Sequence, residues 1–230
     1  MPIRNCTRAL TLGVALAAAA LYAAPASAQL VENTDYRKVD PPAPTASPGK
    51  IEVVEFFSYA CPHCNAFYPL ISAWAAKLPK DVVLRRVPVT FNRPAWINVA
   101  RAFYALQASG DLERLDGKLF HAIHDEHQQL FEEQSLADWV GKNGGSAEKF
   151  AAAYADFGVN NQTVQADKLA QDYRIDSIPT LAVAGRYVAA GPGDQPQPKY
   201  FAEILAHTDA LIARVRAESP PATALKPQRP

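Results

Sequence analysis

Two cysteines separated by two residues are the strongest chemical signal in the sequence. Cys61-Pro62-His63-Cys64 follows a short apolar run and precedes a stretch in which apolar residues recur at helical spacing. At the start of a helix, this spacing brings the thiols close enough to switch between dithiol and disulfide. Cys61 would there face unpaired backbone amides and the positive end of the helix dipole, and His63 offers a further donor or positive charge. The motif therefore predicts a favoured Cys61 thiolate, which makes the disulfide a stronger oxidant.

Two other uses of this cysteine pair compete with redox chemistry. A permanent structural disulfide would close so short a loop that it removes little chain entropy and adds little stability. A zinc site would need more ligands, because Cys61, His63 and Cys64 supply at most three and no second pair follows at finger spacing. The redox interpretation is therefore the stronger one, and it requires neither a metal nor a cofactor.

Three histidines form a second candidate site. His121, His124 and His127 lie three apart on a predicted helix, a spacing that could chelate a metal. Their neighbours are acidic residues and amides, which indicate a solvated face. We expect no metal there, and the sequence leaves the role of these histidines open.

Glu55 precedes the cysteine motif on the apolar run. In a strand, Ile51, Val53, Glu55 and Phe57 point to one side, so the carboxylate shares a face with three apolar side chains. A carboxylate in such surroundings has a raised pKa and could relay a proton to Cys64. Alternatively, this side faces water, or Glu55 pairs with a lysine. The pattern leaves both interpretations open.

The elements that must position the cysteines begin with a strand over 51–57, which is rich in β-branched and aromatic residues. A helix follows up to Leu78, with Pro62 in its first turn and Pro69 inside it, where a proline produces a kink. A second strand is predicted over 82–89. The order strand, loop, cysteine and helix places Cys61 at the beginning of that helix.

The remainder of the chain is mostly helical. The pattern over 91–158 predicts several helices, with Ser135 and Ser146 as caps and Gly158 as a terminator. A further helix over 163–173 leads to Ile178-Pro179, where a cis bond could turn the chain towards a neighbouring loop. The last elements are strands over 180–184 and 187–189, joined by a turn at Gly185-Arg186, and a closing helix over 201–215. The fold class is α/β: a mixed sheet with helices on its faces and an all-α subdomain inserted.

The two ends of the chain differ from its body. Residues 1–28 combine Arg4 and Arg8, an uncharged run and a small-residue Ala-Ser-Ala site, a pattern typical of a secretory signal peptide. Such a signal implies an oxidising compartment, and its removal takes Cys6 away. Residues 40–49 form a proline-rich lead-in, and 219–230 a disordered tail.

The overall composition excludes several classes of protein. Of 230 residues, 49% are hydrophobic, which is enough for a sizeable core. Lysine plus arginine (23) equal aspartate plus glutamate (23), so the electrostatic footprint of a nucleic-acid binder is missing. Three cysteines are too few for a disulfide scaffold.

Taken together, these residues resemble the DsbA-type periplasmic thiol-disulfide oxidoreductases of the thioredoxin-fold superfamily. The segment Glu55-Phe56-Phe57-Ser58 leading into the cysteine motif is similar to the family's active-site segment, and Ile178-Pro179 matches its cis-proline loop. The Pro-His dipeptide separates the chain from thioredoxins, which typically carry Gly-Pro, and from the periplasmic isomerases. Two features depart from the family pattern. Tyr59-Ala60 stands where many relatives have bulkier pairs, and Pro69 kinks the helix differently from some relatives. These departures bear on surface details and on partner preference, not on the redox chemistry.

The resemblance implies a thioredoxin-like mixed sheet flanked by helices. Residues 29–90 and 159–218 would form a discontinuous thioredoxin-like domain, with a helical subdomain over 91–158 inserted. It also implies a periplasmic monomer that donates the Cys61–Cys64 disulfide to reduced exported polypeptides, with Glu55 as proton relay and Ile178-Pro179 as substrate contact. A quinone-linked membrane oxidase like DsbB would restore the disulfide.

Two other function classes stay open. One is a periplasmic disulfide isomerase or reductase, although residues 29–49 are too few for the added dimerisation domain of an isomerase. The other is a non-enzymatic, partner-binding thioredoxin-like protein in which the cysteine pair is structural.

Overall fold

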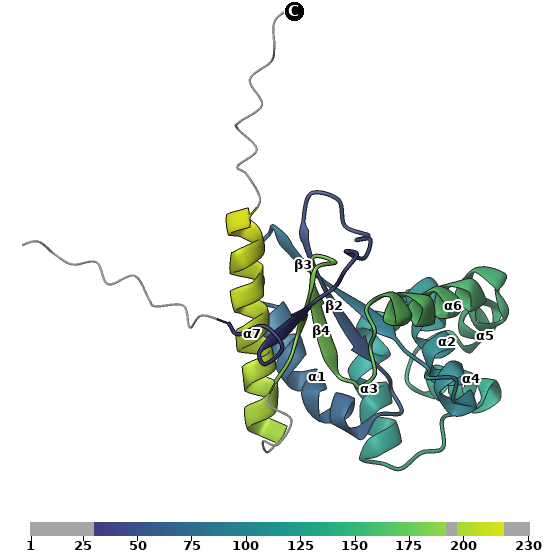
Figure 1. The fold of residues 1–230 in the computed structure, drawn as a ribbon. Coiled ribbons are helices and arrows are strands. Elements are labelled where there is room, and N and C mark those ends of the chain that lie inside the picture. Colours follow the sequence, from purple (N-terminus) through teal and green to yellow (C-terminus); the bar gives the residue numbers. More distant parts are fainter. Residues whose placement is uncertain (1–29, 192–196, 219–230) are drawn as a thin grey trace, which may run out of the picture.

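A five-stranded mixed sheet lies at the centre of this computed structural model, which describes residues 30–191 and 197–218 (Figure 1). The strand order is β1-β5-β4-β2-β3. β2 pairs parallel with β3 and antiparallel with β4, and the pairs β4–β5 and β5–β1 are antiparallel. The strands are β1 (Tyr36–Lys38), β2 (Ile51–Phe57), β3 (Val82–Pro88), β4 (Thr180–Val183) and β5 (Tyr187–Ala189). The predicted signal peptide 1–28 and tail 219–230 lie outside the described residues.

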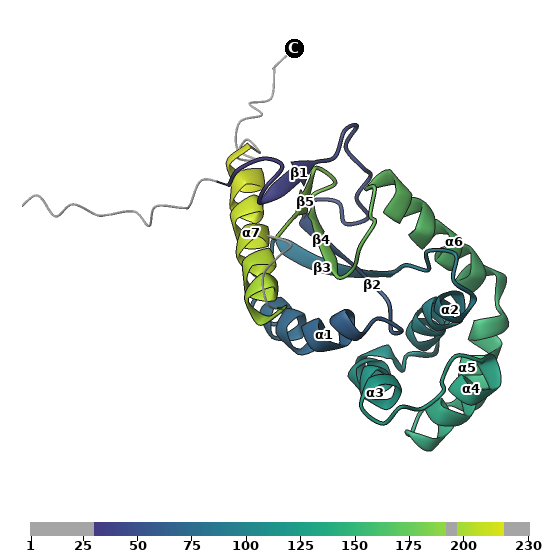
Figure 2. The same ribbon diagram turned by 60° about the horizontal axis from the view of Figure 1, so that its bottom comes forward.

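Helices cover both faces of this sheet. α1 and α7 lie together on one side of it, and α2 and α6 lie on the other (Figure 2). The bounds are α1 (Pro62–Ala75), α2 (Pro94–Ser109), α3 (Leu112–His124), α4 (Glu133–Lys142), α5 (Ala147–Ala155), α6 (Phe157–Asp172) and α7 (Gln197–Glu218). This confirms the α/β fold class with a mainly helical stretch between β3 and β4. No helix among the described residues has the length and apolar character that crossing a membrane requires.

The central strand β2 is buried on both faces, which explains its nearly continuous apolar sequence. Val53 packs in the cluster that includes Phe67 of α1, whereas Phe56 packs in the cluster on the opposite face. All of its residues after Ile51 are buried, the two glutamates included. β2 therefore leads into the cysteine motif from the most enclosed part of the fold.

Several predicted boundaries are wrong. α1 ends at Ala75 rather than at Leu78. Gly158 does not end a helix: the Asp156 side chain accepts a hydrogen bond from the Gly158 amide at 2.7 Å and caps α6, so Gly158 lies in the first turn of that helix. The predicted helix over 163–173 is therefore the later part of α6, and the predicted subdomain boundary at 158/159 falls inside it.

Two further differences concern caps and strands. Ser135 is not the N-cap of α4, which begins at Glu133; its hydroxyl instead donates a hydrogen bond to the Glu132 carbonyl at 2.9 Å. Ser146 does cap α5, accepting from the Lys149 amide. β1 was not predicted, because a strand of only three residues has no detectable period and two of these residues are charged.

The turn between β4 and β5 gives a test of this sheet. Gly185 has φ +71°, and a Cβ there would lie 2.1 Å from the Ala43 carbonyl oxygen. Gly49 has a similar φ of +75° but open space around it. We expect Gly185→Ala to destabilise the protein by about 1–3 kcal/mol more than Gly49→Ala, since the two share the backbone strain and only the first adds a clash. Urea unfolding of both variants measures the difference, and equal losses would contradict this packing.

Candidate active site

Cys61 is the N-cap residue of α1, and both motif cysteines are free thiols. Its backbone is extended, with φ −96° and ψ 118°, and Pro62 occupies the first turn of the helix. Cys61 is 5% exposed and Cys64 is fully buried. The outer sulfur can therefore meet a partner, while the inner one is reached only through it.

Hydrogen bonds at the start of α1 stabilise the Cys61 thiolate. The largest effect on the pKa of Cys61 is the hydrogen bond that the Cys64 thiol donates to its sulfur, which lowers this pKa. Burial raises it. The backbone amides of Cys64 and His63, and the charge of His63, lower it further. Together they lower the pKa of Cys61 to about 6. Burial, followed by the interaction with Cys61, raises the pKa of Cys64 well above its ordinary value. The two thiols thus have opposite protonation at neutral pH.

The exposed His63 lies beside the start of the closing helix. Its Nδ1 forms a hydrogen bond with the side-chain amide of Gln197, the first residue of α7. This contact holds the imidazole next to Cys61 while leaving it accessible.

The Ile178–Pro179 loop faces the cysteine motif across the active site. The Ile178–Pro179 peptide bond is cis, and the Ile178 carbonyl oxygen lies 3.8 Å from Cys61 Sγ. The loop directly precedes β4, which pairs with β2. The sheet therefore brings together two segments that are far apart in the sequence.

Glu55 is completely buried and forms an ion pair with an arginine. Glu55 and Arg86 are partners in the β2–β3 register, and Arg86 Nε donates to Glu55 Oε2 at 2.5 Å. The interpretation in which this side of the strand faces water is wrong, and the pairing partner is not a lysine. Burial raises the pKa of Glu55, with the charge of Arg86 opposing this rise. The charge of Glu55 in turn contributes to the raised pKa of Cys64, so the two groups interact.

Three residues of this buried cluster were not predicted: Tyr59, Arg86 and Asp116. Arg86 also donates to Asp116 of α3, and the Tyr59 hydroxyl donates to the same carboxylate. Tyr59 is fully buried, so its departure from the family pattern concerns the interior rather than the surface. A pair of adjacent arginines in the otherwise apolar strand β3 was the available sequence signal for Arg86. Nothing in the sequence placed Asp116 near it.

The three candidate histidines do not share one helix face. α3 ends at His124, and His127 lies beyond it with φ +55°. His124 Nε2 is 2.7 Å from the Tyr59 carbonyl oxygen, while His121 contacts the carboxylates of Asp125 and Glu126. Within residues 30–191 and 197–218, no group of three or more histidine, cysteine or acidic side chains is placed to hold a metal.

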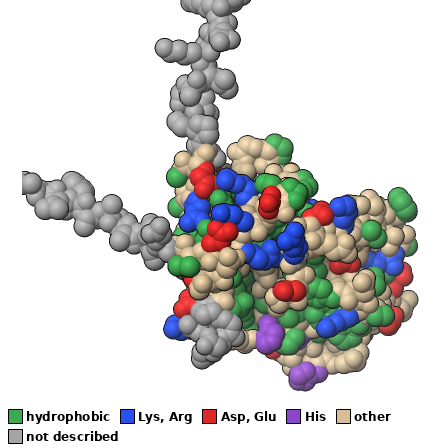
Figure 3. Space-filling model, in the orientation of Figure 1, with side chains coloured by type: hydrophobic (Ala, Val, Ile, Leu, Met, Phe, Trp, Pro, Cys, Tyr) green, Lys and Arg blue, Asp and Glu red, His purple; other side chains and the backbone are tan. Residues whose placement is uncertain are grey.

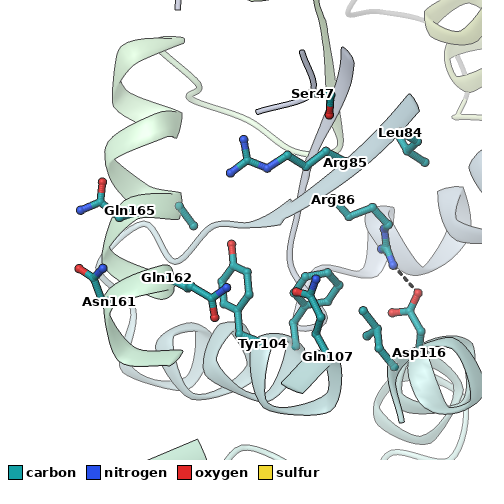
Figure 4. Close-up of a pocket in the computed structure, with 13 residues that line it drawn as sticks. Ser47, Leu84, Arg85, Arg86, Tyr104, Gln107, Asp116, Asn161, Gln162 and Gln165 are labelled. Carbon is teal, nitrogen blue, oxygen red and sulfur yellow. Dashed lines mark hydrogen bonds and ion pairs between the residues drawn. The ribbon is translucent and has the colours of Figure 1, made fainter. Parts of the chain in front are cut away.

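A cavity of about 460 Å³ opens beside β3, away from the cysteines, and Arg86 and Asp116 lie at its edge (Figure 4). Its other lining residues come mainly from α2 and α6. The face of the molecule seen in Figure 3 carries basic and acidic side chains close to one another, with apolar ones between them.

Comparisons with known proteins agree with this geometry. The model of the DSBA-like thioredoxin domain family matches residues 52–205. The thiol:disulfide interchange protein DsbA of Bordetella pertussis is 40% identical over 183 residues, covering 79% of this chain and 85% of that protein. DsbA of Pseudomonas aeruginosa is 37% identical over 212 residues, covering 91% and 98%.

Solved structures give the same result. The crystal structure of Pseudomonas aeruginosa DsbA matches with a TM-score of 0.76 at 36% identity, covering 82% of this chain and 96% of that one. The oxidoreductase DsbA from Xylella fastidiosa matches with a TM-score of 0.73 at 33% identity, covering 80% and 96%. With a dithiol motif at a helix start and sequence similarity along most of its length, this chain belongs to the DsbA family of thiol:disulfide interchange proteins.

Proposed function

We propose that the protein works as an oxidase, giving the Cys61–Cys64 disulfide to reduced polypeptides. The observation that carries this proposal is the hydrogen-bonded Cys61 sulfur at the start of α1, whose pKa lies near 6. A stabilised thiolate favours the reduced protein, so the oxidised protein readily gives its disulfide away. The same property weighs against a reductase role, in which the disulfide must be the more stable form.

The exchange takes two steps. A substrate thiolate attacks Cys61 Sγ, the bond to Cys64 breaks, and Cys64 leaves as a thiolate that takes a proton from Glu55. A second substrate thiolate then attacks the substrate sulfur of the mixed disulfide and releases Cys61 as its stable thiolate. The substrate loses two electrons and gains a disulfide, and the protein keeps the two electrons as a dithiol.

The cis-proline loop is the proposed contact for substrate backbone. Ile178 lies beside the Cys61 sulfur and just before the first residue of β4, so its backbone groups can pair with an extended segment. Backbone pairing does not depend on side chains, which suits an enzyme with many substrates. Pro62 and His63 complete the proposed site by starting the helix and adding charge near Cys61.

The proposed location is the periplasm, based on the signal-like residues 1–28. Its substrates there would be reduced exported polypeptides. Each turnover leaves a dithiol, so an oxidant must restore the disulfide; by family resemblance we propose a quinone-linked membrane oxidase like DsbB.

The low pKa of Cys61 is directly measurable. We expect the rate of iodoacetamide alkylation of Cys61 to rise with a midpoint at about pH 6. Cys64→Ala should move that midpoint upwards, because it removes the largest contribution to the shift, whereas Cys64→Ser keeps a hydroxyl donor and should move it less. A midpoint near 9 in the wild-type protein would rule out the stabilised thiolate.

Replacing each cysteine separates an oxidase from a binding protein. Cys61→Ser should abolish the oxidation of a reduced dithiol peptide, because no sulfur is left for the substrate to attack. Cys64→Ser should also lose turnover, because it has no disulfide to give. With oxidised glutathione as the oxidant, its Cys61 should attack the glutathione disulfide, release one reduced glutathione and remain as a mixed disulfide, visible by mass spectrometry, because no second thiol resolves it. Peptide oxidation that persists in Cys61→Ser would refute the proposed function.

The proton relay is tested by Glu55→Gln. We expect disulfide donation at pH 7 to slow by about 10²-fold, the usual effect of losing a general acid, with a flatter dependence on pH. Glu52→Gln is the matched control, since Glu52 is also buried on β2 but receives hydrogen bonds from Ala46 and Ser47 on the other side. An unchanged pH profile for Cys64 in Glu55→Gln would remove the relay role.

A further inference from the structure

Arg86 is shared between two carboxylates at the junction of the sheet and the helical insertion. Its Nε donates to Glu55 of β2, and its Nη1 donates to Asp116 of α3. The guanidinium also lies 3.9 Å from the centroid of the Phe57 ring. Burial alone would lower the pKa of Arg86, but the charges of Glu55 and Asp116 raise it above its ordinary value, so Arg86 stays charged.

The two carboxylates differ in their surroundings. The Glu55 side chain is 0% exposed, and its Oε1 has no hydrogen-bond partner in the described part of the chain. The Asp116 side chain is 12% exposed at the edge of the cavity, where Figure 4 shows it pointing towards Arg86. It accepts a second hydrogen bond from Tyr59, whose pKa is raised well above its ordinary value by burial and by Asp116, so that its hydroxyl keeps the proton it donates.

Charge counting shows which carboxylate takes a proton. With both carboxylates ionised, one arginine faces two negative charges, so this buried cluster carries a net charge of −1. Adding one proton makes it neutral, which a low-dielectric interior favours. Asp116 accepts hydrogen bonds from two donors, Tyr59 and Arg86, whereas Glu55 accepts from one donor and is completely buried. The proton therefore goes to Glu55.

Without Asp116 the outcome would be different. Glu55 and Arg86 alone would form a neutral ion pair, and a proton on Glu55 would leave the arginine unpaired in the interior, which is strongly unfavourable. Glu55 would then stay ionised and could not supply a proton to a leaving thiolate.

We propose that Asp116 is a positioning residue for the exchange reaction. It forms an ion pair with Arg86 and thereby keeps Glu55 able to carry a proton. This inference rests on the relay role proposed for Glu55. It connects the helical insertion, through α3, to a group buried behind the cysteines.

The ionisable groups that face Glu55 come from several elements. β4, its other strand neighbour, carries none. Cys64 is the group that Glu55 serves, and its pKa is raised partly by the Glu55 charge. Glu55 interacts with Arg86 from β3, Asp116 from α3 and Cys64 from α1. Tyr59 from the loop before α1 and Tyr68 from α1 interact with Asp116 and Arg86 rather than with Glu55.

The test is a carbon-13 NMR titration of the Glu55 carboxyl in the full-length reduced protein. In the wild-type protein it should titrate above the ordinary glutamate range. In Asp116→Asn the midpoint should fall by about one pH unit, a tenfold change in proton affinity. Asp116→Glu, which keeps the charge, should restore it. Asp111→Asn is the matched control, because it removes another arginine-paired carboxylate at the start of the same helix.

A wild-type Glu55 that titrates at or below its ordinary value would overturn the inference even if Asp116→Asn did not fold. An unchanged midpoint in a folded Asp116→Asn would overturn it too, and would leave Asp116 a merely structural role, visible as a lower melting temperature alone.

The kinetic counterpart uses peptide oxidation: Asp116→Asn should shift the pH profile to lower pH, and this shift should vanish in the Glu55→Gln background. If Glu55→Gln by itself has no effect, the relay fails, while the NMR titration still decides what Asp116 does to Glu55.

Discussion

Hydrogen bonds to the Cys61 sulfur are the interaction on which the rest of the structure depends. They come from the Cys64 thiol and from the first backbone amides of α1, so they exist only if the helix begins directly after Cys61. Pro62 provides that start, and the buried strand β2 fixes where the chain enters it. These bonds stabilise a thiolate, and a thiolate is present only in the reduced protein. The fold therefore favours the dithiol state over the disulfide state.

The buried charges behind the cysteines are costly to the fold and useful to the reaction. Glu55 and Arg86 lose their hydration, and their pairing only partly offsets that loss. The arginine is also surrounded by aromatic rings, with Phe57 the nearest. Because Asp116 comes from the helical insertion and Glu55 from the central strand, the cluster joins the two parts of the fold. An apolar cluster could join them equally well, but it could not hold a proton.

The sequence predicted the parts of the site that are local. Cys61, Pro62, His63 and Cys64 are consecutive, and their helix start follows from apolar spacing; the closing helix and the β4–β5 turn were also predicted correctly from their patterns. Glu55 was ambiguous because alternation along one strand cannot show what the neighbouring strand offers. Asp116 could not be predicted, since its meeting with Arg86 depends on how α3 packs against the sheet. β1 and the start of α6 were missed because a three-residue strand and a capped glycine carry little periodic signal.

The redox equilibrium with glutathione tests the central claim most directly. The protein is incubated with defined mixtures of reduced and oxidised glutathione at several pH values, and the fraction of the Cys61–Cys64 disulfide is measured by mass spectrometry after acid quenching. We expect the protein at pH 7 to be reduced under conditions that keep glutathione largely oxidised. Because the pKa of Cys61 is lowered to about 6, this preference should grow with pH above that value and level off below it. A protein whose disulfide persists in excess reduced glutathione, with no such dependence on pH, would contradict the account.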